Sequence, residues 1–270
     1  MNDLDAFAKL AQAVAPWREQ LVFIGGWAHR LHRFHPSANP LPHQPVFTRD
    51  TDLALANNAP IEGDMKAALA AHGFTEELTG EHRPPVAHYI LGKEELGFYA
   101  EFLTPLIGSG RRRGGTPDAT MAKAGISAQK IRHLDILLVA PWVITLGSQN
   151  GIPLPATMDV QVVHPLCFMV QKFLIHKDRP PAKRAQDLLY VHDTIELFGA
   201  LIPDFATIWK TVVRPELGSL ADVVLEQSTA SFSKVDDVIR RAALIPQDRR
   251  ISPDEMQLTC QLAFQEILGI

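Results

Sequence analysis

The first part of the chain alternates between helix-like and strand-like patterns of apolar residues. A helix over residues 3–15 is predicted because apolar side chains recur there at helical spacing, at Leu4, Phe7, Leu10, Ala11 and Val14. The apolar run 21–24 predicts a short buried strand that Gly25 and Gly26 end, and a second helix is expected from Trp27. Residues 35–45 contain four prolines, which exclude regular structure there.

Further strands and helices follow, and the pattern changes at Pro165. Strands are predicted over 50–55, 86–91, 97–103, 134–146 and 157–163, with a helix over 62–72 and a charged turn at Lys93–Glu95. After Pro165, all segments favour helices, over 166–177, 182–198, 203–213, 218–230, 233–243 and 253–268. We therefore expect an α+β protein, with a small mixed β-sheet domain in residues 1–164 and an all-helical domain in residues 165–270.

Composition and charge exclude several classes of protein. Hydrophobic residues make up 46% and charged residues 21% of the chain, which is typical of a folded globular protein. The net charge of −4 gives no overall attraction to nucleic acid, although a local basic patch remains open. Cys167 and Cys260 lie in apolar stretches and are expected to be buried free thiols. With no signal-peptide pattern and no segment long enough to cross a membrane, a cytoplasmic protein without membrane contact is expected.

The chemistry of the sequence centres on Asp50 and Asp52. Residues i and i+2 of a strand point to the same face, so the two carboxylates would lie side by side. Their repulsion would be relieved by a divalent cation, and hard oxygen ligands favour Mg²⁺ or Mn²⁺, which also take phosphate oxygens. A pair of this kind also occurs in solvated turns and in glycosyltransferases. A glycosyltransferase would need a fold of alternating strands and helices, which the helical second half of this chain does not match.

The sequence around the pair supports a nucleotide site. Upstream, Gly25 and Gly26 lie between a strand and a helix, where glycines let a phosphate approach the backbone and the helix N-terminus favours an anion. Downstream, Glu101 lies within the otherwise apolar strand 97–103, where a carboxylate is costly to bury unless it is paired or binds a metal. The alternative for Glu101 is exposure on an edge strand.

These motifs resemble the DNA polymerase beta-like nucleotidyltransferase superfamily. The resemblance implies that Asp50 and Asp52 hold two metal ions, and that Glu101 completes one metal site and helps to activate the attacking hydroxyl. It also implies that residues 1–164 form the catalytic domain and that residues 165–270 complete the nucleotide cleft. The sequence departs from the family in three ways: Gly26 replaces a common Ser, Glu101 a common Asp, and the segment before Asp50 is long.

The second half is similar to AbiE-type toxin nucleotidyltransferases and to bacterial nucleotidyltransferase-fold proteins of unassigned substrate. The similarity lies in the run from His164 to Leu174, with Lys172, and in the basic and acidic residues that follow, Arg179, Lys183 and Asp187. It implies that Lys172, Lys183 and Arg179 face a nucleoside triphosphate such as ATP. Asp187 is expected to orient Lys183, because the two residues are four apart on one helix face. Ordinary surface positions remain the alternative for the basic residues.

Two other groups of residues carry weaker signals. His29, His32, His35 and His43 cluster near the glycine turn, and we expect surface or nucleotide-stacking histidines in preference to a structural zinc site. The Arg111–Arg113 run is either a solvated loop or a contact for phosphates of a nucleotide or an RNA. Arg49 is expected to form an ion pair that holds the acidic pair in place.

The expected activity is transfer of a nucleoside monophosphate from a nucleoside triphosphate to an acceptor hydroxyl. Three interpretations stay open: a toxin-like enzyme with an RNA or tRNA acceptor and an antitoxin partner, transfer to a small molecule or a protein side chain, and a non-catalytic nucleotide-binding protein. The three acidic residues argue against the last interpretation, and the acidic net charge argues against a large RNA surface.

Overall fold

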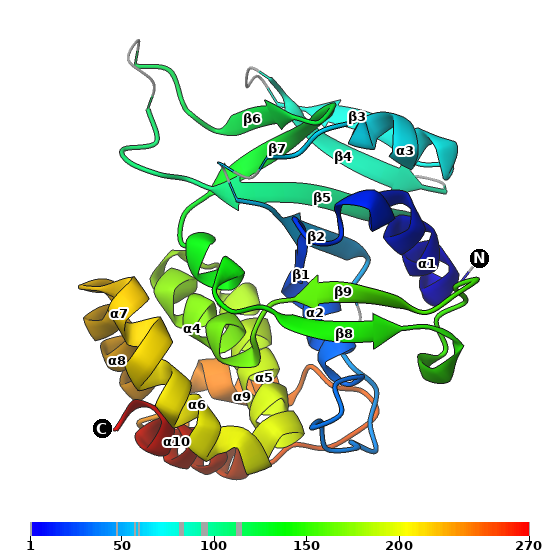
Figure 1. The fold of residues 1–270 in the computed structure, drawn as a ribbon. Coiled ribbons are helices and arrows are strands. Elements are labelled where there is room, and N and C mark those ends of the chain that lie inside the picture. Colours follow the sequence, from blue (N-terminus) through cyan, green and yellow to red (C-terminus); the bar gives the residue numbers. More distant parts are fainter. Residues whose placement is uncertain are drawn as a thin grey trace. The chain divides into compact units, whose positions relative to one another are not determined.

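The computed structural model describes residues 2–46, 48–56, 58, 60–80, 84–92, 97–111 and 115–269. The chain divides into two compact units (Figure 1). The first comprises residues 1–34 and 47–163, and the second comprises residues 35–46 and 164–270. In the described part of the chain, no helix is both long enough and apolar enough to cross a membrane.

The first unit is built on a mixed sheet to which nine described strands contribute. The central path runs β3-β4-β5-β2-β1-β9-β8, and β7 pairs with β5 and with β6 (Figure 1). β2 and β5 are parallel, as are β1 and β9 and β5 and β7, and the other pairs are antiparallel. The strands are β1 (Val22–Ile24), β2 (Asp50–Ala54), β3 (Thr75–Thr79), β4 (Val86–Leu91), β5 (Phe98–Pro105), β6 (Thr120–Lys123), β7 (Ile126–Ile131), β8 (Trp142–Leu146) and β9 (Met158–Val162).

One face of this sheet is buried by aromatic packing against helices. The described α-helices of the unit are α1 (Asp3–Val14), α2 (Gly25–His32) and α3 (Met65–Ala71). Phe7 of α1 stacks on Trp27 of α2 with ring centroids 4.4 Å apart, and Trp27 meets the edge of Phe98 of β5 at 5.6 Å. All three aromatic residues are buried. The opposite face of β4, β5 and β2 is only partly buried, as the alternating burial along these strands shows, and it carries Asp50, Asp52, Glu101 and His88.

The second unit is helical (Figure 1). Its α-helices are α4 (Pro165–Ile175), α5 (Pro181–Phe198), α6 (Ile202–Ile208), α7 (Arg214–Leu217), α8 (Leu220–Ser231), α9 (Asp237–Ala243) and α10 (Pro253–Leu268), and a π-helical turn (Trp209–Val213) joins α6 to α7. Phe173 of α4 packs edge-on against Phe264 of α10 at 4.9 Å, and Phe264 stacks on Phe232 at 6.0 Å. Proline begins α4, α5 and α10, where the missing N–H costs no helical hydrogen bond.

The α+β fold predicted from the sequence is confirmed, with differences in several elements. Residues 134–146 are not one strand: Asp135–Leu138 form a 3₁₀ turn, and only Trp142–Leu146 form a strand after Pro141. The glycine pair does not separate β1 from the next helix, since α2 already begins at Gly25. β3, β6 and β7 were not expected, because their polar residues hide the strand pattern.

The helix predicted over 62–72 is present but shorter, Met65–Ala71, because Asp64 caps it by accepting a hydrogen bond from the Ala67 amide. The charged turn at Lys93–Glu95 lies outside the described residues. Residues 35–45 form no regular element, as their prolines predict, and the roles assigned to residues 1–164 and 165–270 stay predictions.

Candidate functional site

Asp50 and Asp52 lie on the partly exposed face of β2. Both are half-buried, whereas Thr51 and Leu53 between and after them are fully buried. This alternation shows that the two aspartates point to one side of the sheet and that the intervening residues face the aromatic core. The Thr48 hydroxyl donates a hydrogen bond to the Asp50 carboxylate, which fixes the orientation of that side chain at the start of the strand.

The parallel pairing of β2 with β5 brings Glu101 beside the aspartates. In this register Asp52 lies opposite Glu101, and Asp50 lies opposite Tyr99. Paired residues on neighbouring strands project from the same face, so the three carboxylates share one side of the sheet across a single strand spacing of about 4.8 Å. The structure therefore places Asp50, Asp52 and Glu101, which are separated by up to fifty residues in the sequence, on one face of two neighbouring strands as an acidic cluster.

Gly25 lies directly against the carboxylate of Asp52. Its φ angle is +66°, and a Cβ atom at this position would lie 2.0 Å from the Asp52 Oδ2 atom. Only glycine meets both conditions, because an alanine would be strained at this φ and would collide with the carboxylate. Gly26 follows in the first turn of α2, which has no side-chain cap on its N-terminal amides among the described residues. Backbone donors thus lie next to the acidic cluster.

The electrostatics at this face reflect the gathering of negative charge. Burial and the charge of Asp50 raise the pKa of Glu101, while the neighbouring His88 opposes that shift. Burial, followed by the charges of Asp50, Glu101 and Asp52, raises the pKa of Tyr99. The cluster therefore favours the binding of a positive charge, which would stabilise the ionised form of Glu101.

His88 and Tyr99 are components of this face that the sequence did not reveal. His88 of β4 pairs in register with Glu101, and its Nε2 atom lies 3.5 Å from the Glu101 Oε1 atom. The rings of His88 and Tyr99 are 6.1 Å apart and 28° from parallel. Alternation along β5 would place Tyr99 on the same face as Glu101, but the pairing of β4 with β5 could not be read from the sequence.

Lys172 and Arg179 of the second unit converge on a buried carboxylate. The Lys172 Nζ atom lies 3.1 Å from one oxygen of Asp187, and the Arg179 Nε atom lies 3.1 Å from the other. Only 2% of the Asp187 side chain and 10% of the Lys172 side chain are exposed, so this is a buried ion network. Lys172 also lies over the rings of Phe168 and Tyr190, at 5.0 Å and 5.7 Å from their centroids.

Lys183 is placed differently from the sequence-based expectation. The prediction that Asp187 orients Lys183 is wrong, since Lys183 is exposed and its Nζ atom reaches the Gln186 side chain at 3.4 Å. Asp187 faces inward from α5 and accepts contacts from Lys172 and Arg179 instead. The spacing of residues along α5 could not reveal these partners of Asp187, because Lys172 lies on α4 and Arg179 follows the turn after it. The contact of these basic residues with a triphosphate stays a prediction.

The histidines near the glycine turn are not a surface group. His29 and His32 are fully buried, so the expectation of surface histidines is wrong for both. The His32 Nε2 atom lies 2.8 Å from the Val163 carbonyl oxygen, and its ring meets Trp142 edge-on at 6.3 Å. These two histidines belong to the packing of α2 within the first unit.

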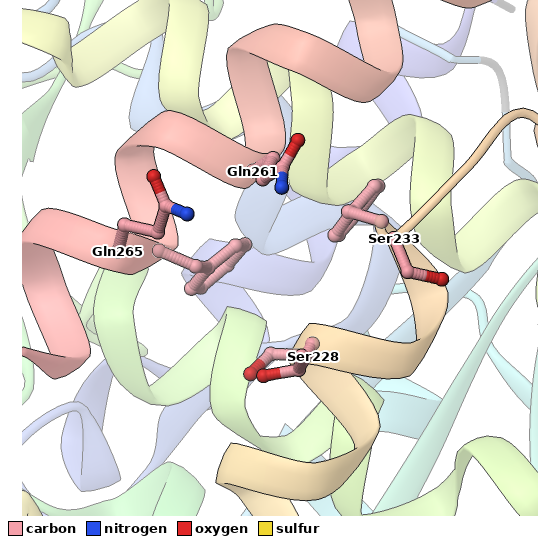
Figure 2. A pocket seen from close by; sticks show the side chains of 7 residues that line it. Ser228, Ser233, Gln261 and Gln265 are labelled. Carbon is pink, nitrogen blue, oxygen red and sulfur yellow. The ribbon is translucent and has the colours of Figure 1, made fainter. Parts of the chain in front are cut away.

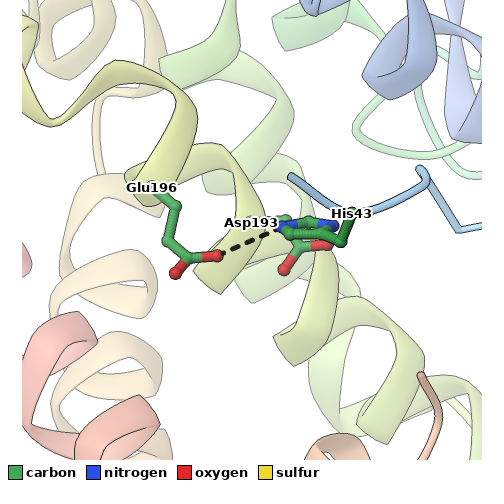
Figure 3. Close-up of side chains that lie close together, drawn as sticks. All are labelled: His43, Asp193 and Glu196. Carbon is green, nitrogen blue, oxygen red and sulfur yellow. Dashed lines mark ion pairs between the residues drawn. The ribbon is translucent and has the colours of Figure 1, made fainter. Parts of the chain in front are cut away.

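His43 belongs to a charged cluster of the second unit (Figure 3). Ligand atoms of His43, Asp193 and Glu196 all lie within 4.8 Å of one another, so the set could hold a metal ion. The His43 Nε2 atom is 3.7 Å from Glu196, and Asp193 forms an ion pair with Arg249. The Arg249 guanidinium already supplies a positive charge to the buried Asp193. A metal ion at this cluster would therefore have to compete with Arg249 for the Asp193 carboxylate.

Two remaining features carry less chemistry. A pocket of about 200 Å³ lies between α8, the residues that follow it, and α10, and it is lined by hydroxyl, amide and phenyl side chains (Figure 2). It is lined by Ser228, Thr229, Phe232, Ser233, Gln261, Phe264 and Gln265, none of which is an acid, a base or a strong nucleophile.

Of the Arg111–Arg113 run, Arg112 and Arg113 lie outside the described residues, and Arg111 donates to the Gly115 carbonyl at 3.0 Å.

The close approach of Gly25 to Asp52 predicts a specific effect of alanine. Gly25→Ala should lower the free energy of unfolding by more than the roughly 1–2 kcal/mol expected for a left-handed alanine alone, and should weaken Mn²⁺ binding, because Asp52 must move. Gly108→Ala is the matched control: its φ is +79° and no atom lies within 4 Å of the added Cβ. Urea denaturation and Mn²⁺ titration measure both effects, and equal results for the two variants would contradict the argument.

The raised pKa of Glu101 predicts a pH dependence of stability. The folded protein holds this proton more tightly than the unfolded chain, so the metal-free protein should lose stability as pH rises above 4.5 through the raised pKa. Glu101→Gln should remove that loss, and should therefore be more stable than the wild type at pH 8 but not at pH 4. Urea denaturation in the presence of a chelator tests this prediction. Glu77→Gln is the control, because Glu77 of β3 lies on the same face of the sheet as Glu101. Identical pH profiles for wild type and Glu101→Gln would refute it.

The buried ion network of Asp187 predicts a large loss of stability on its removal. Asp187→Ala should cost about 3–5 kcal/mol, because it leaves the buried Lys172 ammonium without its carboxylate. Lys183→Ala, a change at an exposed position of the same helix, should stay within about 0.5 kcal/mol of the wild type. Urea denaturation compares the two variants, and similar losses for both would show that Asp187 does not hold this network together.

Several solved structures and one family model are similar to this chain. No curated protein matches the chain. The nucleotidyltransferase toxin MenT4 of Mycobacterium tuberculosis H37Rv matches 99% of this chain and 83% of its own, with 13% identity and a TM-score of 0.44. An antigenic nucleotidyltransferase-like protein of Paracoccidioides brasiliensis matches 84% of this chain and 97% of its own, with 17% identity and a TM-score of 0.36. A family model described as nucleotidyltransferase matches residues 2–214, and the chain therefore belongs to the nucleotidyltransferase family.

Proposed function

We propose that the protein transfers a nucleoside monophosphate from a nucleoside triphosphate to an acceptor hydroxyl, with Asp50, Asp52 and Glu101 as its metal-binding carboxylates. The observation that carries the proposal is the parallel register of β2 and β5, which sets Glu101 opposite Asp52 on one face of the sheet. Membership of the nucleotidyltransferase family supports the same reaction class.

The donor set of this cluster fits Mg²⁺ or Mn²⁺. Three carboxylates supply hard oxygen ligands, and the raised pKa of Glu101 indicates that its surroundings do not fully compensate its charge. When bound, the divalent cations would lower the pKa of the acceptor hydroxyl and neutralise charge that develops on the leaving oxygen. Asp50 and Asp52 would hold the cations from β2, and Glu101 would complete the set from β5.

The triphosphate is expected to approach the β1 side of the cluster. Gly25 and Gly26 begin α2 there, and the first amides of a helix attract phosphate oxygens. The absence of a side chain at Gly25 allows the Asp52 carboxylate to lie against the backbone that would meet the phosphates. A nucleotide such as ATP would thus meet backbone donors beside the Asp52 carboxylate, which would help to hold the cations.

In the proposed reaction an acceptor oxygen attacks the α-phosphorus. A new O–P bond forms, the bond from the α-phosphorus to the bridging oxygen of the β-phosphate breaks, pyrophosphate leaves and the hydroxyl proton is released. The chain's own contribution is to position the reactants and to present fixed negative charge to the cations. An RNA or tRNA acceptor, a toxin role with an antitoxin partner, and a cytoplasmic location stay predictions from the sequence.

A labelling experiment tests this proposal. The protein is incubated with each α-³²P-labelled nucleoside triphosphate, Mg²⁺ or Mn²⁺, and a cell lysate, and the label is followed into RNA, protein and small molecules. Asp50→Asn and Asp52→Asn should each lower the labelling rate by about 100-fold or more, since one electrostatic contact to developing charge is worth roughly 10²–10³ in rate.

Asp135→Asn is the matched control, because Asp135 is an exposed aspartate of the same unit in a 3₁₀ turn. It should label as fast as the wild type. Equal labelling by the wild type and by the Asp50 and Asp52 variants would refute the assignment of these residues. If no fraction becomes labelled but MgATP binds, the result would favour a non-catalytic nucleotide-binding protein.

A further inference from the structure

The face that carries the three carboxylates also carries a pair of aromatic rings. His88 and Tyr99 lie on β4 and β5, with ring centroids 6.1 Å apart and planes 28° from parallel. Both residues are half-buried, and 30% of the His88 side chain is exposed. Their neighbours on the other face, Tyr89 and Phe102, are buried against each other. The His88–Tyr99 pair thus offers ring surface on the side of the sheet where the acidic cluster lies.

The order of strands places His88 and the glycine turn on opposite sides of the carboxylates, and Tyr99 lies beside Glu101 on β5. The sequence of neighbours is β4-β5-β2-β1, so His88 lies beyond Glu101 in one direction, and Gly25 follows β1 in the other (Figure 1). In nucleotidyl transfer, the attacking and leaving oxygens lie roughly in line across the phosphorus. If the triphosphate approaches from the β1 side, the acceptor must come from the β4 side, where His88 lies against the Tyr99 ring.

The charges on this side limit what kind of acceptor can lie there. Glu77 of β3 is opposite His88 in the sheet, and Glu101 is opposite it on β5. Burial, followed by the charges of Asp50, Glu101 and Asp52, raises the pKa of the Tyr99 hydroxyl, and the positive charge of Arg49 opposes that shift. These carboxylates disfavour a phosphate group at the rings themselves, whereas an uncharged planar base would stack on them.

We propose that the His88–Tyr99 pair is a stacking subsite for the base of a nucleoside whose free hydroxyl is the acceptor. The inference rests on the proposed function and names its acceptor class: a nucleoside, either free or as the terminal residue of a single-stranded RNA. Tyr99 then acts by orienting the acceptor beside Glu101, and the chemistry stays with the carboxylates.

Binding of a short RNA tests the subsite without a need for turnover. A fluorescent single-stranded RNA with a 3′-terminal adenosine is titrated with protein and Mg²⁺, alongside the same RNA lacking its terminal base. Tyr99→Phe keeps the ring and should bind as the wild type does. Tyr99→Leu removes the ring and should bind about tenfold or more weakly, since a stacked base contributes an effect of that order.

The terminal base should account for the difference between the two variants. With the abasic RNA, wild type, Tyr99→Phe and Tyr99→Leu should bind equally weakly. Free adenosine that displaces the RNA would identify a nucleoside acceptor, and failure of adenosine to compete would identify the RNA end. Equal binding of the base-bearing RNA by Tyr99→Phe and Tyr99→Leu, or no binding by the wild type of either RNA or adenosine, would overturn the proposal.

Calorimetric titration with MgATP separates this inference from the proposed function. Tyr99→Leu should bind MgATP as the wild type does, which also shows that the variant is folded. If the wild type binds neither MgATP nor any other nucleoside triphosphate in the presence of Mg²⁺, the proposed function fails, and the RNA titration still decides whether the rings hold a base. Loss of MgATP binding in Tyr99→Leu alone would overturn the assignment of Tyr99 to the acceptor side.

Discussion

The parallel register between β2 and β5 is the constraint on which the candidate site depends. It sets Asp52 opposite Glu101 and Asp50 opposite Tyr99, so three carboxylates from distant parts of the sequence share one face. A shift of one residue would turn Asp50 and Asp52 into the aromatic core and bring Thr51 and Leu53 to the outer face. The register is therefore specified by the same hydrophobic alternation that buries Phe98, Ala100 and Phe102 under the helices.

Gathering like charges on one face has a cost that other parts of the unit offset. The stack of Phe7, Trp27 and Phe98 buries large rings on the opposite face, and each such ring contributes a few kcal/mol to folding. Gly25 adds a second local constraint, because its positive φ angle and its contact with Asp52 leave no room for a side chain. Packing of the aromatic core thus stabilises the sheet, although the carboxylates on its other face repel one another and favour the binding of a cation.

The sequence predicted what depends on local pattern and missed what depends on pairing. Asp50 and Asp52 could be placed together because strand alternation is local, and the change to an all-helical second half at Pro165 followed from periodicity. The place of His88 beside Glu101 cannot be read from the sequence, because it depends on the antiparallel pairing of β4 with β5. Asp187 was assigned to Lys183 by helical spacing, whereas its partners come from α4 and the following turn. The polar strands β3 and β6 carry too few apolar residues to show alternation.

Charge compensation distinguishes the acidic cluster of the sheet from the buried acids of the helical unit. Asp187 is paired with Lys172 and Arg179, and Asp193 is paired with Arg249, so in both cases the chain supplies its own cation. At Glu101 the balance is reversed: burial and Asp50 outweigh the opposing influence of His88, and its pKa is raised. Carboxylates that are compensated internally hold helices together, because an external cation would have to displace a buried one. A carboxylate whose surroundings favour its neutral form gains most from an external cation, which makes the sheet face the better candidate for metal-assisted chemistry.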